Sequence, residues 1–318
     1  MKKAKKVVKI FLIIIAVLVV LISAIYINHR ICLKNEAGLL TPLGEIVEVD
    51  GQNMSVYIEG EGDTTLVFMS GGGTSSPILD FKSLYSLLSD DYKIAVVEKF
   101  GYGFSDVADT ERDIDSILED TRTALTQAGL TAPYVLCPHS MSGLEALYWA
   151  QKYPDEVSAI IGLDMAVPQY YDSMNINISL MRLSSWAANI GVIRLIPNIS
   201  ESDAIKYGTL SDEEKEIYRA VFYSRTATKT MIDECKAVKE NAEKVNNMGV
   251  PQLPMLLFIS DGSGGTGFDE DTWRKIPVEY ISQVEDGKYI ELDCPHYVHD
   301  YEYEAISQNI IEFLSNQQ

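Results

Sequence analysis

Eight short runs of apolar and β-branched residues recur along the chain, and helix-like stretches separate most of them. The runs cover residues 45–50, 54–60, 64–70, 92–98, 133–137, 157–165, 254–260 and 288–293. Helical spacing predicts intervening helices at 78–89, 114–125, 141–153 and 306–314. The first two runs flank Asp50-Gly51, which is typical of a tight hairpin turn. Strands alternating with helices indicate an α/β chain, whose mostly parallel eight-stranded sheet has helices on both faces.

One stretch breaks this alternation. Residues 165–250 contain no strong strand pattern but several helical ones, such as "SDEEKEIYRAVFYS" and "ATKTMIDECKAVKENAEKV". Because these helices fall between two core strands, we expect a helical cap at 165–250. The core then comprises residues 45–164 and 251–318.

The N-terminus carries an apolar run, "IFLIIIAVLVVLISAIYI", at residues 10–27. At about 1.5 Å per residue it nearly crosses a hydrocarbon core of roughly 30 Å. We expect a transmembrane anchor at 10–28, with a basic segment at 1–9 and a short stalk at 29–44. Five lysines precede the run, so the positive-inside rule puts the N-terminus in the cytoplasm and the globular part outside. A cleaved signal peptide is the alternative, although its apolar region is usually shorter, about 7–15 residues.

The charge is unevenly distributed. Residues 1–30 hold five lysines and one arginine and no acid, a charge of +6, so the total of −20 leaves −20 − 6 = −26 on residues 31–318. Such an acidic domain repels nucleic acid, which is therefore not an expected partner. The four cysteines are scattered and form no C-x-x-C pair, so neither a disulfide framework nor a metal site is predicted, and no cofactor is expected.

The segment "PHSMSG" (residues 138–143) lies between a predicted strand and a predicted helix. A serine nucleophile is presented on such a strand-to-helix turn, where small neighbouring residues avoid crowding. Ser140 is the candidate nucleophile, with Ser142 and Gly143 supplying the small positions. A helix N-cap is the competing interpretation of Ser140.

A serine nucleophile needs a base. The chain has four histidines, of which His29 flanks the apolar run and His139 is adjacent to Ser140, where side chains diverge. His296 follows the last predicted strand, on a loop that would reach the same edge of the sheet as Ser140. His296 is therefore the preferred base, with His299 three residues later as the alternative.

The oxyanion of an acyl-transfer reaction needs backbone N–H donors. The glycine-rich loop "MSGGGTSS" suggests the amide of Gly72, and the amide of Met141 follows the nucleophile. Two carboxylates end core strands and are candidates to orient the histidine, namely Asp164 and Asp261. Three acids further along the second loop, Asp269, Glu270 and Asp271, are reserves.

These segments together resemble the α/β-hydrolase superfamily from about residue 45 to the end. The matching features are "VDGQNMSVYIEGEG", "VFMSGGG", "EKFGYGFSD", "PHSMSGLEALYWAQKYPDEV" and "PHYVHDYEYEAI", in the family's order. The resemblance implies an eight-stranded α/β-hydrolase core and supports His296 over His299. It also favours Asp164, because some relatives take the acid from the end of the sixth strand.

The sequence departs from the family pattern at several positions. Ser70 replaces a common histidine, Glu98 replaces the usual aspartate, and Pro138 and Pro295 replace glycines. The nucleophilic aspartate of epoxide hydrolases and haloalkane dehalogenases is absent from the turn. The resemblance implies a membrane-anchored serine hydrolase acting on a small-molecule ester, less readily an amide or peptide as in aminopeptidases. A catalytically silent relative that binds a small ligand is the alternative; substrate identity and oligomeric state are not indicated.

Overall fold

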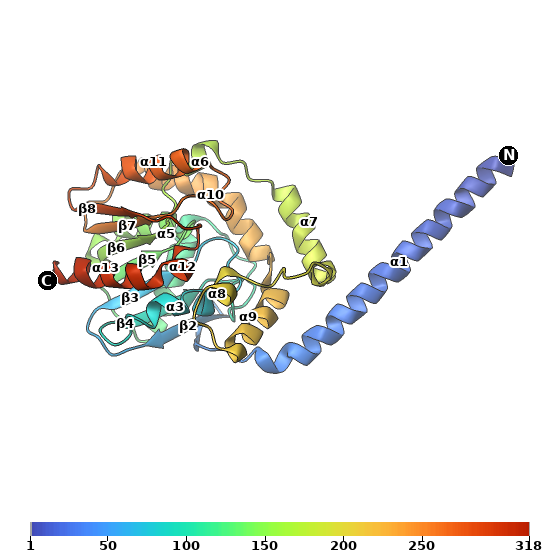
Figure 1. Ribbon diagram of the computed structural model, residues 1–318, viewed down its shortest axis with the longest axis horizontal. Helices are drawn as coiled ribbons and strands as arrows, with labels where there is room; N and C mark the ends of the chain where they lie inside the picture. Colours follow the sequence, from blue (N-terminus) through green and yellow to red (C-terminus); the bar gives the residue numbers. More distant parts are fainter. Residues whose placement is uncertain (1, 318) are drawn as a thin grey trace.

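The computed structural model describes residues 2–317 and is built around one eight-stranded sheet (Figure 1). The strands are β1 (Glu45–Val49), β2 (Gln52–Glu59), β3 (Thr65–Met69), β4 (Lys93–Glu98), β5 (Tyr134–Pro138), β6 (Val157–Leu163), β7 (Met255–Ile259) and β8 (Gly287–Glu291). Their order across the sheet is β1-β2-β4-β3-β5-β6-β7-β8. Strand β2 pairs antiparallel with β1 and β4, and the other pairings are parallel. The predicted mostly parallel eight-stranded sheet is therefore confirmed.

The turn between β1 and β2 is a two-residue hairpin. Val49 pairs with Gln52, which leaves Asp50 and Gly51 in the turn with φ values of 50° and 76°. Two consecutive positive φ angles match the right-handed twist of the flanking strands, and aspartate and glycine tolerate them best. The dipeptide therefore sets the register of this pair.

Two layers of helices cover the sheet. One face carries α4 (Ile114–Gln127), α5 (Ser142–Lys152) and α11 (Glu270–Ile281), and the other carries α2 (Pro77–Asp80), α3 (Lys82–Tyr85), α12 (Val298–Tyr301) and α13 (Tyr303–Ser315). Successive strand residues point to opposite faces. In β3, Val67 and Met69 join the first layer, whereas Leu66 and Phe68 join the second.

The helix expected over residues 78–89 is interrupted. It forms two short helices, α2 and α3, that meet at the fully buried Phe81. The ring of Phe81 packs on Phe68 and, with centroids 4.6 Å apart, on His299. Burial of this ring against the sheet outweighs the continuous helical pattern of the sequence.

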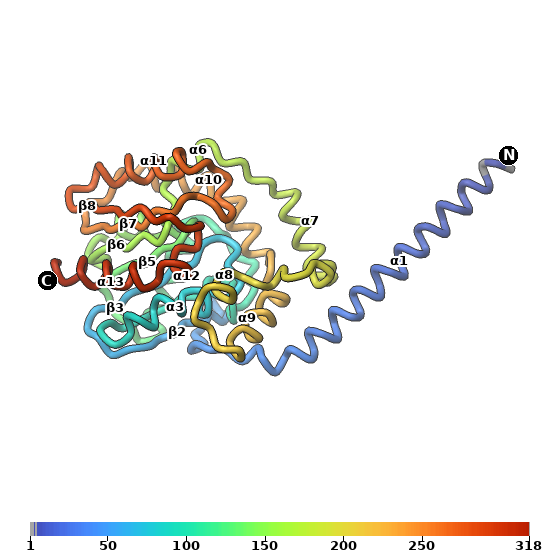
Figure 2. The backbone as a smooth tube through the Cα atoms, viewed as in Figure 1, coloured from blue at the N-terminus to red at the C-terminus, as the bar shows by residue number. Residues whose placement is uncertain are grey.

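The segment between β6 and β7 is helical. It contains α6 (Tyr170–Ser173), α7 (Ile178–Asn189), η3 (Val192–Leu195), α8 (Asp203–Lys206), α9 (Asp212–Arg225) and α10 (Lys229–Asn247). We refer to residues 165–250 as the cap. Figure 2 shows the cap on the side of the molecule from which the N-terminal helix projects. Leu79 of the core packs with Ile205, Leu210 and Tyr218 of the cap, so the two parts share buried apolar contacts.

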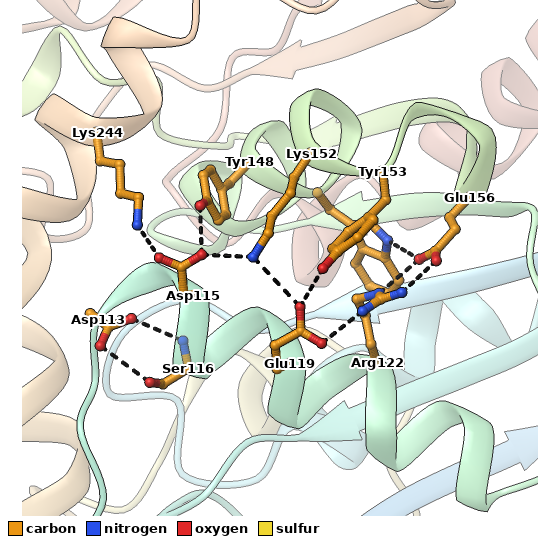
Figure 3. Close-up of polar contacts among 11 residues, drawn as sticks. Asp113, Asp115, Ser116, Glu119, Arg122, Tyr148, Lys152, Tyr153, Glu156 and Lys244 are labelled. Atoms are coloured by element: carbon orange, nitrogen blue, oxygen red, sulfur yellow. Dashed lines mark hydrogen bonds and ion pairs between the residues drawn. The ribbon is translucent and has the colours of Figure 1, made fainter.

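A polar cluster forms a second contact between the cap and the core (Figure 3). Asp115 on α4 accepts hydrogen bonds of 2.7 Å from both Tyr148 and Lys152 on α5, and it also pairs with Lys244 on α10. Although burial favours the neutral acid, the two ammonium groups hold the pKa of Asp115 well below its usual range. One carboxylate therefore links three helices.

The N-terminal helix α1 (Lys2–Glu36) projects away from the domain (Figure 1). It is long and apolar enough to cross a membrane, with a mean hydropathy of 3.3 over a window of which none is buried. The helix continues to Glu36 and into η1 (Ala37–Leu39), so much of the segment expected as a stalk is helical. The reason is tertiary: Arg194 of the cap contacts both His29 and Glu36 on one side of this helix.

Gly143 fixes how closely α5 approaches the start of the cap. A Cβ atom at this position would lie 2.2 Å from the backbone oxygen of Ala166. We expect Gly143→Ala to lower the free energy of unfolding by about 1–3 kcal/mol, because backbone must move to relieve the overlap. Urea unfolding of the full chain in detergent measures this change. Gly38→Ala is the control, since its Cβ would meet nothing within 4 Å; equal stability of the two variants would contradict the prediction.

Candidate active site

The turn between β5 and α5 holds Ser140 in an unusual backbone conformation. Its φ is 53°, in the left-handed region that non-glycine residues rarely adopt. The hydroxyl of Ser142 donates to the carbonyl oxygens of Met69 (2.6 Å) and His139 (2.9 Å), and the carbonyl of Ser140 accepts from the amide of Ala166 at 2.7 Å. Strained backbone of this kind persists only where surrounding contacts fix it, and it is common at active sites.

Ser140 lies beside a histidine and an aspartate. The Nε2 atom of His296 is 2.9 Å from Oγ of Ser140, and its Nδ1 atom is 2.5 Å from Oδ2 of Asp164. His296 is 8% exposed and Asp164 is 3% exposed, whereas Ser140 is partly exposed. Because a carboxylate accepts hydrogen bonds, the contact with Asp164 places the proton on Nδ1 and leaves the Nε2 lone pair facing the serine.

Asp164 follows the end of β6 and is held by donors on two other elements. Its Oδ1 accepts from the amide of Ser260 (2.7 Å) and from Nε1 of Trp273 (3.0 Å), and its Oδ2 accepts from the hydroxyl of Ser260 (2.6 Å). Its own φ is 50°. Ser260 immediately follows β7, a position visible in the sequence, whereas nothing in the sequence pattern pointed to Trp273.

The alternative acids lie elsewhere. Among the described residues, the carboxylate of Asp261 has one hydrogen-bond donor, the amide of Ser263 at 2.7 Å. Asp269 is the N-cap of α11 and accepts from the amide of Thr272 at 3.0 Å. Neither carboxylate reaches His296, so the structure brings Asp164 rather than Asp261 to the histidine.

The two candidate oxyanion donors are adjacent. A Cβ on Gly72 would lie 2.9 Å from Cε of Met141, and a Cβ on Gly71 would lie 2.6 Å from Cβ of Ser140. Within residues 2–317, the amides of Gly72 and Met141 donate to no protein acceptor. Free amides beside a nucleophile are what an oxyanion site requires.

The glycine loop is linked to the cap through buried charges. The amide of Gly73 is 3.4 Å from the hydroxyl of Tyr102, and that hydroxyl donates to Glu234 of α10 at 2.7 Å. Glu234 also pairs with the buried Lys99. Although burial favours the neutral acid, Lys99 and Arg112 hold the pKa of Glu234 below its ordinary value. Separating the two partners of a buried ion pair would leave a charge buried without its partner, which is strongly destabilising. The pair therefore fixes α10 relative to the loop.

His139 has a role that the sequence did not reveal. Its Nε2 lies 3.2 Å from the carbonyl oxygen of His296, and the two rings pack with centroids 4.6 Å apart. Burial, with His296 and His299 nearby, holds the pKa of His139 well below its ordinary value. The neutral ring therefore donates from Nε2 and supports the loop that carries His296.

His299, the alternative base, points away from Ser140. Its Nε2 is 3.1 Å from Oδ2 of Asp80, whose Oδ1 accepts from Tyr218 at 3.0 Å. Ligand atoms of Asp80, His299 and Asp300 lie within 4.8 Å of one another, a separation that would suit a cation. However, burial and the nearby Asp80 raise the pKa of Asp300 well above its usual range. The hydrogen bonds of this cluster join His299, Asp80 and Tyr218, whereas both carboxyl oxygens of Asp300 have no hydrogen-bond partner among the described residues.

Glu98, which replaces the family's usual aspartate, is fully buried at the end of β4. Its Oε2 accepts from the amide of Phe104 at 2.8 Å, and a Cβ on Gly103 would lie 1.9 Å from its Oε1. Burial raises the pKa of Glu98 from its ordinary value of 4.5 to about 7. The longer side chain thus fits only because the adjoining loop residue is glycine.

The raised pKa predicts a pH-dependent stability. Between pH 4.5 and about 7 the unfolded chain has released the Glu98 proton while the folded chain retains it, so stability falls as pH rises through this window. Relative to Glu98→Gln, we expect the wild type to lose about 3 kcal/mol between pH 4.5 and 8. Urea unfolding of both proteins across this range, with the exposed Glu279→Gln as a surface control, measures the difference. A gap between wild type and Glu98→Gln that stays constant with pH would refute it.

The comparisons agree with this architecture. The alpha/beta hydrolase fold family matches residues 64–186. The uncharacterized protein YbdG of Bacillus subtilis (strain 168) is 38% identical over 322 residues, covering 99% of each chain. Among solved structures, Cfl2 from Burkholderia cenocepacia has a TM-score of 0.67 at 18% identity over 85% of this chain and 94% of its own. The enol-lactonase from Burkholderia xenovorans LB400 has a TM-score of 0.62 at 16% identity over 85% of this chain and 100% of its own. The chain belongs to the α/β-hydrolase superfamily.

Proposed function

We propose that this protein is a membrane-anchored serine hydrolase that cleaves a carboxylic ester of a small molecule. The single observation that carries the proposal is the continuous set of contacts from Ser140 through His296 to Asp164, at 2.9 and 2.5 Å. A serine hydroxyl becomes a useful nucleophile when a histidine accepts its proton and a third group orients that histidine. An N-cap serine, the competing interpretation, needs no such partners.

The chemistry follows from the tautomer of His296. Oγ of Ser140 bonds to the ester carbonyl carbon while its proton moves to Nε2 of His296, and Asp164 stabilises the imidazolium through Nδ1–H. The carbonyl oxygen becomes an oxyanion that the amides of Gly72 and Met141 bind. Collapse of the tetrahedral adduct breaks the carbon–oxygen bond, and the departing alcohol takes the proton from Nε2. Water activated by His296 then hydrolyses the acyl-serine and restores the enzyme.

Ester cleavage is favoured over the dehalogenation and epoxide hydrolysis carried out by other proteins of this fold. Haloalkane dehalogenase DbeA and an epoxide hydrolase share this fold at 18% and 16% identity. At the turn where those families place an aspartate nucleophile, this chain has Ser140. Amide or peptide cleavage uses the same groups, so it belongs to the same proposal as a less favoured substrate class.

Covalent labelling tests the nucleophile. We expect a fluorophosphonate probe to label the full chain in detergent at Ser140, with loss of fluoride, because the Nε2 lone pair of His296 activates the hydroxyl. Ser140→Ala and His296→Ala should lose both labelling and turnover of p-nitrophenyl acetate. Folded wild-type protein that neither reacts nor turns over would instead indicate the catalytically silent, ligand-binding relative.

The orienting acid is tested by comparing two aspartates. We expect Asp164→Asn to lower kcat by about 10⁴, because an amide donating to Nδ1 moves the proton to Nε2. Asp261→Asn is the matched control, since its carboxylate bonds to the amide of Ser263 instead. Steady-state kinetics separate kcat from KM. A larger loss in Asp261→Asn than in Asp164→Asn would refute the assignment of Asp164.

The anchor is part of the same proposal. Five lysines in the first turns of helix α1 precede its apolar part, which has the length and hydropathy of a membrane span; this supports an N-terminus in the cytoplasm and a catalytic domain on the outer side. The measurement for insertion is flotation of the full chain with phosphatidylcholine vesicles after an alkaline wash.

A further inference from the structure

Part of the cap exposes an unusual number of apolar side chains. We call this set the apolar cap face: Leu180, Leu183 and Trp186 of α7, and Leu195, Ile196 and Ile199 just beyond. Their exposed fractions run from 38% to 64%, although large apolar side chains in this protein are otherwise mostly buried outside α1. Leu180, Leu183 and Trp186 are spaced i, i+3, i+6, which places them along one side of the helix. Exposed apolar side chains along one side of a helix are typical of an interaction site.

The apolar cap face lies next to the end of the proposed membrane span. Arg194, which adjoins Leu195, makes bonds of 2.8 and 2.6 Å to the two carboxylate oxygens of Glu36 and one of 2.9 Å to Nδ1 of His29. Its guanidinium also lies 3.9 Å from the ring centre of Tyr223 on α9. The cap is therefore clamped onto α1 through a bidentate, partly buried ion pair.

The clamp leaves little distance between the cap and the bilayer. His29 is two residues beyond the apolar run that ends at Ile27, a rise of about 3 Å along a helix. His29 is 2% exposed, and a Cβ on Gly191 would lie 2.3 Å from its Cβ, so the loop after α7 rests directly on α1. Figure 1 shows α7 on the edge of the domain from which α1 projects.

We propose that the apolar cap face inserts into the interfacial layer of the bilayer that α1 spans, on the side of the catalytic domain. This inference rests on the proposed anchoring by α1 and adds a second contact with the membrane. Tryptophan is favoured at the membrane–water interface, and helices with one apolar face lie in its plane. The charge of −26 on residues 31–318 opposes attraction to anionic headgroups, so contact comes from apolar insertion.

The chain carries its own probe for this contact. Of its three tryptophans, Trp149 and Trp273 are 0% and 2% exposed, whereas Trp186 is 51% exposed. We place the full chain in phosphatidylcholine nanodiscs and measure emission with acyl-brominated phosphatidylcholine or with aqueous iodide. The difference between wild type and Trp186→Phe isolates the Trp186 signal. Brominated lipid should lower this signal about twofold or more, while iodide leaves it nearly unchanged.

A matched control places the probe far from the membrane. Tyr289 is 46% exposed and belongs to β8, a strand that lies across the domain from α1 (Figure 1). In the Trp186→Phe background, Tyr289→Trp should respond to iodide and not to brominated lipid. The same pattern from Trp186 itself would overturn the proposal, as would shielding of Trp186 from both quenchers, which indicates contact with a second copy of the chain.

The outcomes separate this inference from the proposed function. Failure of the full chain to float with lipid would refute both the proposed anchor and the proposed contact of the cap with the membrane. Loss of fluorophosphonate labelling with Trp186 still quenched by brominated lipid would refute the hydrolase and leave the membrane contact standing. Normal fluorophosphonate labelling together with quenching of Trp186 by iodide would refute the membrane contact and leave the proposed hydrolase standing.

Discussion

The contact between the backbones of Ser140 and Ala166 is the constraint on which the candidate site depends. The carbonyl of Ser140 accepts from the amide of Ala166 at 2.7 Å, and the α-carbon of Gly143 packs against the oxygen of the same residue. The turn after β5 and the chain leaving β6 are thus joined through main-chain atoms. Such a joint sets the spacing of Ser140 and Asp164 and supports a positive φ at both of them.

The same contact lies where the chain leaves the core and enters the cap. The cap begins directly after Asp164, and it ends before β7, whose following residue, Ser260, donates twice to Asp164. The cap therefore leaves the core at this carboxylate, whereas its last residues return at the opposite end of β7, which runs parallel to β6. On α10, the last helix of the cap, Glu234 reaches Tyr102 and, through it, the glycine loop at Gly73. The cap is consequently tied to the site at its N-terminal end and through α10, rather than resting on the sheet as a separate layer.

The features of the fold and of the candidate site that could be predicted are those set by residues close together in the sequence. The strands were predictable because short apolar runs and the Asp50-Gly51 turn are local signals, and the parallel sheet followed from their alternation with helices. Ser140 and His296 could be proposed because a chain with four histidines offers few partners. The break at Phe81 was not predictable, since it results from packing against Phe68 on a strand.

The choice between carboxylates and the role of His139 depend on contacts that are distant in sequence. Asp164 and Asp261 both end core strands, and only the donors from Ser260 and Trp273 turn Asp164 toward the histidine. His139 bonds to the backbone carbonyl oxygen of a residue 157 positions away. Because every residue has a backbone carbonyl, the residue types in the sequence do not indicate this contact. Side-chain motifs therefore reveal which groups are available, whereas the tertiary contacts select among them.

The helical continuation of α1 changes what the proposed anchor can do. A flexible stalk would limit only the distance of the domain from the membrane, because its residues could rotate freely. A helix that runs through Glu36 and is clamped by Arg194 also fixes orientation. The clamped part is the cap, which contacts the loops beside Ser140 through Tyr102 and through the bond from Arg225 to the carbonyl of Gly103. Fixing the cap relative to α1 therefore also fixes these loops relative to α1.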